Sequence, residues 1–150
     1  MLAIFDLKRG VRYSSRLLLV EYIGLIISST IVFRNYREPA GINLMPFWSY
    51  KAIIEGQTQL IYGSIMNVLV FVPLGLLLGI AFKRMNWRKA FWTCTSISIM
   101  IETLQFVFER GFTEFDDLVH NVAGGMIGYG LYVGMVRMAK KISTIELIAK

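Results

Sequence analysis

Four long apolar runs, separated by short charged segments, divide the chain. A membrane-spanning helix needs roughly 20 predominantly apolar residues, and each run is about that long. In a bilayer such runs form helices, because every backbone polar group needs a partner within the segment. The sequence therefore predicts an all-α fold, a polytopic membrane helix bundle that forms a single domain over residues 1–150. The four predicted transmembrane helices are 14–33, 62–82, 90–108 and 118–138.

Composition supports a membrane protein and narrows its chemistry. Hydrophobic residues make up 55% of the chain and charged residues 17%, and the mean hydropathy is +0.56, which is more apolar than an ordinary soluble domain. The basic residues that give the net charge of +6 lie beside the apolar runs. This placement argues against a nucleic-acid partner. With one cysteine, Cys94, and one histidine, His120, a disulfide within the chain and a zinc-finger site are both excluded. We expect no cofactor.

The basic residues are distributed unevenly about the predicted spans. Twelve of the sixteen fall in 8–16, 83–89 and 137–150, which lie on one side of a four-span bundle. The positive-inside rule then predicts that both termini are cytoplasmic. The first run follows basic residues without a small-residue cleavage site, so we expect an uncleaved first span. The four basic residues on the other side are Arg34, Arg37, Lys51 and Arg110.

Polar residues recur at spacings of three and four in the third and fourth spans, and this pattern places them on one helix face. Asn67 in the second span lies at a matching depth, within roughly 5 to 10 Å of the outer interface at 1.5 Å per residue. Polar groups in a bilayer usually face other helices or a water-filled cavity. We therefore expect one ligand-binding cluster beneath the outer face. Its residues are Asn67, Glu102, Gln105, Arg110, Glu114, Asp117 and Asn121.

The cluster has more than one interpretation. It could lock the helices together, although hydrogen-bonded pairs in membranes average only about 0.6 kcal/mol. It could be catalytic, with Glu102 or Asp117 as a general base. A hard cation held by Glu102, Asp117 and His120 is a further alternative. Because His120 lies off the polar face, we expect no metal. Asp116 or Asp117 is expected to cap the start of the fourth helix.

Small residues indicate where helices approach closely. We expect helix packing at Gly75, Gly79, Gly124 and Gly128, and a packing face on the first span along Glu21, Gly24 and Ser28.

The outer loop, 34–61, is the one long connection and carries an aromatic run. The segment 48–55 is predicted to form a short helix lying at the membrane interface. The alternatives are a loop anchored by its aromatics and a lid over the polar cluster.

The spaced motifs of residues 42–132 resemble the VanZ-like family of small bacterial membrane proteins. They are N-L-M-P-F (43–47), N-V-L-V-F-V-P-L-G (67–75), E-T-L-Q (102–105) and E-F-D-D-L-V-H-N-V-A-G-G-M-I-G-Y (114–129). The resemblance implies a multi-pass protein of the bacterial cytoplasmic (inner) membrane, of a family linked to glycopeptide resistance and notably to teicoplanin.

The first hypothesis is that the outer cluster binds a cell-envelope lipid or a glycopeptide and so contributes to antibiotic resistance. Its partners would be the lipid bilayer and that ligand. The alternatives are a membrane-embedded enzyme that acts on a lipid headgroup, and a structural or proton- or ion-conducting subunit. A conducting pathway needs polar residues at both depths, and Glu21 is the only one predicted in the inner half.

Overall fold

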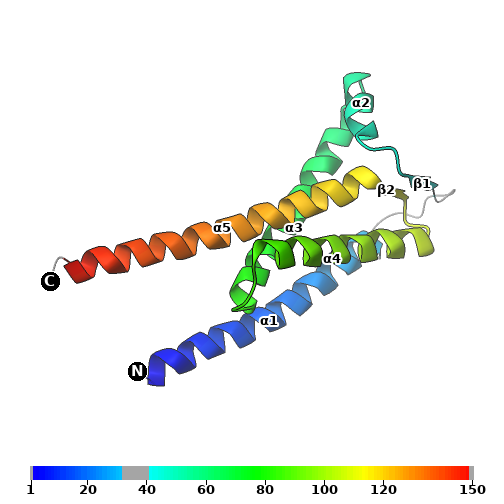
Figure 1. Cartoon of the computed structure of the whole chain (residues 1–150). Helices are drawn as coiled ribbons and strands as arrows, with labels where there is room; N and C mark the ends of the chain where they lie inside the picture. The colour runs from blue at the N-terminus through cyan, green and yellow to red at the C-terminus, as the bar shows by residue number, and fades with distance from the viewer. Residues whose placement is uncertain (1, 32–40, 149–150) are drawn as a thin grey trace.

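The computed structural model describes residues 2–31 and 41–148 (Figure 1). Arg34, Arg37, Lys150 and the end of the first predicted span lie outside this range. The elements, in chain order, are α1 (Leu2–Ile31), β1 (Gly41–Asn43), α2 (Trp48–Ile54), α3 (Gln59–Ala81), α4 (Trp87–Val107), β2 (Phe112–Glu114) and α5 (Phe115–Ile148). The prediction of a helical fold is confirmed, and each predicted span falls mainly within one long helix.

Two of these helices, α1 and α5, extend well beyond the apolar runs that predicted them. The added residues are rich in Lys and Arg, which are good helix formers, so the backbone continues as helix after the hydropathy falls. Within the described residues, α3 and α4 are long and apolar enough to cross a membrane. The passage of α1 and α5 through the bilayer stays a prediction.

Backbone contact between α3 and α5 sets the centre of the bundle. A Cβ atom at Gly75 would overlap the Gly125 carbonyl oxygen, and one at Gly128 would overlap the Val72 carbonyl oxygen. Gly124 lies equally close to Val68, and Gly79 lies against the ring of Tyr132. Only glycine permits this approach, so the four glycines expected at packing positions lie where two helices touch.

Helix α1 covers the other side of α3. Leu19 and Ile26 pack with Leu74 and Leu78 in the buried core, and the Tyr22 hydroxyl donates to the Val70 carbonyl at 2.8 Å. The expected packing face along Glu21, Gly24 and Ser28 is instead exposed, and no atom would meet a Cβ at Gly24. The larger apolar residues of α1 form its contact with α3 because they bury more surface there.

Two short strands, which the sequence does not predict, close one end of the bundle. Strand β1 pairs with β2 in parallel, with Gly41 opposite Phe112 and Asn43 opposite Glu114. The strands and α2 lie at one end of the bundle, and both termini lie at the other (Figure 1). We call the first the polar end. The second, with the α3–α4 turn, is the basic end.

Candidate functional site

Glu102 of α4 is held against β2 at the polar end. Its side chain is buried, with 6% of the residue exposed. Its carboxylate oxygen Oε2 accepts a hydrogen bond from the Glu114 backbone N–H at 3.3 Å, and its backbone carbonyl accepts one from the Thr113 hydroxyl at 3.1 Å. These contacts join the polar face of α4 to the strand that leads into α5.

A second hydrogen bond joins α4 to α5, one turn further into the bundle. The Asn121 amide nitrogen Nδ2 donates to Ser98 Oγ at 3.0 Å, and both residues are buried. Ser98 and Glu102 are four residues apart and therefore lie on one helix face. A buried polar atom is costly without a partner, so this pair fixes how α5 is rotated against α4.

Gln105 lies near the end of α4, three residues after Glu102. The Arg110 backbone N–H donates to the Gln105 carbonyl at 2.8 Å, and the chain reverses through Glu109 and Gly111, whose φ angles are 53° and 135°. Gln105 itself is buried, and its side-chain oxygen Oε1 has no hydrogen-bond partner in the part of the chain described. A buried acceptor without a donor is a position that a ligand or water can satisfy.

Asp116 connects α5 to the segment that precedes α2. It is 1% exposed. Its Oδ1 accepts from the Phe47 N–H at 2.6 Å, and its Oδ2 accepts from the Ser49 N–H at 2.9 Å and from the Ser49 hydroxyl at 2.5 Å. An acidic residue is also favoured in the first turn of a helix by the helix dipole. Asp116 therefore positions α2 on the bundle.

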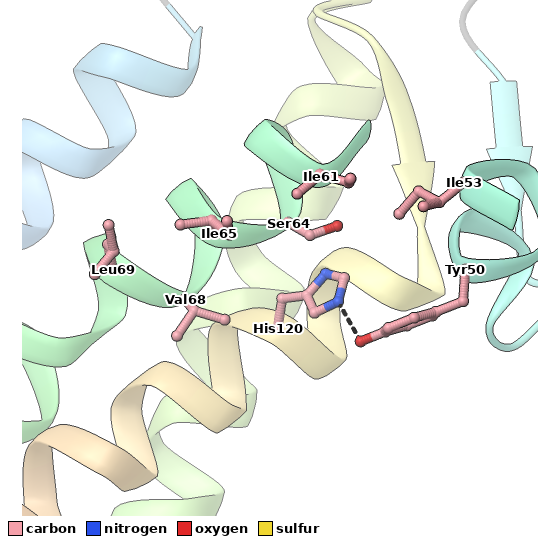
Figure 2. Close-up of a pocket in the computed structure, with 8 residues that line it drawn as sticks. All are labelled: Tyr50, Ile53, Ile61, Ser64, Ile65, Val68, Leu69 and His120. Atoms are coloured by element: carbon pink, nitrogen blue, oxygen red, sulfur yellow. Dashed lines mark hydrogen bonds between the residues drawn. The ribbon is translucent and has the colours of Figure 1, made fainter. Parts of the chain in front are cut away.

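His120 lies on the side of α5 that faces α2 and α3 (Figure 2). Its Nε2 shares a hydrogen bond of 2.8 Å with the Tyr50 hydroxyl. Its Nδ1 is buried and has no partner among the described residues. Both residues line an apolar groove of about 420 Å³. The start of α5 thus has two different polar sides, one toward α4 and one toward this groove.

The predicted cluster residues all lie toward the polar end. Glu102 and Gln105 are buried on α4, Asn121 is buried on α5, and Arg110, Glu114 and Asp117 are half-buried. Asn67 is half-buried on α3, and the hydrogen bonds that connect α4, β2 and α5 do not include it. Helices α4 and α5 therefore supply the connected part of the layer, together with β2.

The sequence does not identify Ser49 or Tyr50 as site residues. It also does not predict the contacts that Asp116 and His120 make with them. Asp116 was expected only as a cap, yet it binds a segment 67 residues earlier in the chain. Tyr50 and His120 are 70 residues apart. Neither pairing has a periodic signal, because the loop before α2 must fold back for it to form. The sequence signal for these contacts is the presence of polar residues beside the aromatic run of the outer loop.

No group of three or more His, Cys, Asp or Glu side chains within the described residues could hold a metal ion. The alternative of a cation bound by Glu102, Asp117 and His120 therefore gains no geometric support. His120 lines the groove toward α3, while Glu102 bonds to β2.

Among the described residues, α3 and α4 are long and apolar enough to cross a membrane, and this property is typical of helical membrane proteins. The family model described as VanZ/LLP1 matches residues 17–137, and the chain therefore belongs to the VanZ/LLP1 family. Protein VanZ of Enterococcus faecium is 34% identical over 98 residues. The match covers 65% of this chain and 55% of that relative, so the aligned region spans just over half of the relative's length. No solved structure matches the chain.

Proposed function

We propose that this VanZ-like protein crosses the bacterial cytoplasmic membrane four times, with both termini in the cytoplasm. We further propose that its outward-facing polar end binds a cell-envelope lipid or a glycopeptide and contributes to glycopeptide resistance. Family membership supports the link to resistance. The basic residues in the first part of α1, in the last part of α5 and in the α3–α4 turn support the orientation.

One observation carries the proposed binding site: the buried Gln105 Oε1 has no partner among the described residues. It lies in a layer that also contains the buried Glu102 carboxylate and the Asn121 amide. Such a layer offers several hydrogen-bond acceptors shielded from water, where each hydrogen bond is stronger than in solution. Peptide amides and sugar hydroxyls, which occur in glycopeptides and in envelope lipids, supply matching donors.

Expression in a glycopeptide-sensitive bacterium tests this function. We expect the wild-type chain to raise the teicoplanin concentration that inhibits growth, and Glu102→Gln and Asp117→Asn to return it to the empty-vector value. Glu55→Gln is the matched control, because Glu55 is an exposed acid outside the layer. Membrane levels are compared by immunoblot. Equal protection by wild type and both variants, at equal levels, would overturn the proposal.

Thiol labelling tests the orientation independently. In a Cys94→Ala background, Gln57→Cys lies between α2 and α3 at the polar end, and Asn86→Cys lies in the α3–α4 turn at the basic end. A membrane-impermeant maleimide added to intact cells should label position 57 and leave position 86 unlabelled until the cells are lysed. The reverse pattern would invert the proposed topology.

A further inference from the structure

The groove between α2, α3 and α5 is separate from the Glu102 layer. It opens on the α3 side of α5, whereas Glu102 and Ser98 lie on the α4 side. Its volume is about 420 Å³. Figure 2 shows side chains from all three helices surrounding it. They are Tyr50, Ile53, Ile61, Ser64, Ile65, Val68, Leu69 and His120.

One wall of the groove is a straight apolar ridge on α3. Ile61, Ile65 and Leu69 are spaced by four residues and so stand one above another along a helix face. At 1.5 Å per residue the ridge is about 12 Å long. The three side chains are 40%, 52% and 55% exposed, so the groove is open sideways along one of the helices suited to crossing a membrane. In a bilayer the hydrocarbon chains of lipids cover that surface.

The lining of the groove also includes the polar side chains of Tyr50, Ser64 and His120. His120 is 5% exposed, and its Nδ1 has no partner among the described residues. Figure 2 shows the ring edge that carries Nδ1 turned toward Ser64, while Nε2 points to Tyr50. If the Tyr50 hydroxyl donates to Nε2, the proton of the neutral imidazole lies on Nδ1, which becomes a donor. A carbonyl oxygen at this point would satisfy it.

We propose that this groove binds one acyl chain of a bilayer lipid, with the lipid's ester carbonyl accepting a hydrogen bond from His120 Nδ1. The ridge on α3 contacts the chain, and His120 fixes the depth of its head. The choice of leaflet rests on the orientation given under the proposed function. The site itself uses neither Glu102 nor Gln105.

Photolabelling in vesicles tests the site. The full chain is placed in phosphatidylethanolamine–phosphatidylglycerol vesicles that contain a trace of phosphatidylglycerol with a diazirine in one acyl chain. Labelled peptides are then mapped by mass spectrometry. We expect labelling to concentrate on residues 61–69 of α3. Labelling spread evenly over the exposed faces of α3 and α4 would show ordinary solvation by lipid and overturn the proposal.

A matched pair of variants tests occupancy of the groove. Ile65→Trp fills it, whereas Ile99→Trp adds the same ring to α4 at an isoleucine of nearly equal exposure, 51% against 52%. Both positions are exposed, so neither change disturbs the core. Ile65→Trp should lower labelling of residues 61–69 about tenfold, the change that follows from 1.4 kcal/mol of lost binding, and Ile99→Trp should leave it unchanged. Equal labelling in the two variants would contradict a defined site.

The hydrogen bond has its own signature, because His120 is the only histidine. Protein labelled with ¹⁵N-histidine gives one imidazole spin system, and lipid added to delipidated protein should shift its Nδ1 resonance. The shift should be absent in Ile65→Trp and retained in Ile99→Trp. A resonance unaffected by lipid in the wild type would overturn the assignment. Retained resistance in Glu102→Gln, which would overturn the proposed function, would leave these measurements unchanged, so the two proposals fail separately.

Discussion

The two ends of the bundle hold their charged side chains in opposite ways. At the polar end, Asp116 and Glu102 are buried and accept hydrogen bonds from the backbone of other elements. At the basic end, the cationic side chains stay exposed around an open cavity of about 400 Å³, lined by Arg16, Lys83, Arg84 and Lys89 with Phe82 and Met85. Arg16 donates to the Ala81 carbonyl at 3.3 Å, and its guanidinium lies 5.5 Å from the Phe82 ring centre.

This difference indicates different tasks. A buried carboxylate needs specific partners, because an uncompensated buried charge is strongly destabilising. An exposed Lys or Arg can reach water and headgroups along its flexible stem and needs no defined partner. The polar end should therefore be sensitive to single substitutions. The basic end should tolerate them.

The largest difference in stability effect is expected between two glycines of α5. Gly128 touches the α3 backbone at Val72, whereas no atom lies within 4 Å of a Cβ built at Gly134, nearer the basic end. Gly128→Ala should destabilise by about 3 kcal/mol, the upper part of the overpacking range, because backbone cannot move aside cheaply. Gly134→Ala should stabilise by up to about 1 kcal/mol through helix propensity.

SDS-driven unfolding in mixed micelles measures both changes. The buried thiol of Cys94 gives a second readout, since its labelling rate rises when the bundle opens. Similar unfolding curves for Gly128→Ala and Gly134→Ala would show that the two helices do not depend on the contact.

Asp116→Ala should produce the next largest effect. It removes the acceptor for two backbone N–H groups and a hydroxyl, and leaving such groups unpaired should cost about 2 kcal/mol. Glu55→Ala is the matched control, since Glu55 is exposed at the end of α2 with only a 3.8 Å ion pair to Lys51. Micelle unfolding would again measure the change. A cost no greater than that of Glu55→Ala would mean that α2 is held by other contacts.

The hydrogen bond between Ser98 and Asn121 should couple α4 and α5 more weakly. A double-mutant cycle with Ser98→Ala and Asn121→Ala should give a coupling of about 0.6 kcal/mol, the average for such pairs in membranes. The same cycle with Ser98→Ala and Ser96→Ala should give no coupling, because Ser96 is exposed. Zero coupling between Ser98 and Asn121 would show that this hydrogen bond does not hold α4 against α5.

The sequence predicts the parts of this molecule that depend on local pattern. Apolar run length places the four long helices, and the three-and-four spacing places Ser98 and Glu102 on one face of α4. The sequence does not predict the β1–β2 pairing or the contacts of Asp116 and His120, because these join segments 67 to 71 residues apart through a loop without periodicity. The sequence also does not predict that the face formed by Glu21, Gly24 and Ser28 is exposed. Small residues favour close packing without specifying a partner.

The smallest effect on stability is expected at the basic end. Lys83→Gln and Arg84→Gln together should change the free energy of unfolding by less than about 0.5 kcal/mol, as is usual for exposed charges. The same double variant reduces the positive charge of the α3–α4 turn, which is one determinant of orientation. Impermeant maleimide labelling of Asn86→Cys in intact cells should therefore increase from its wild-type background. A fall in stability comparable to that of Asp116→Ala would erase the contrast between the ends, because Lys83 and Arg84 would then be structural partners within the bundle rather than free to reach headgroups.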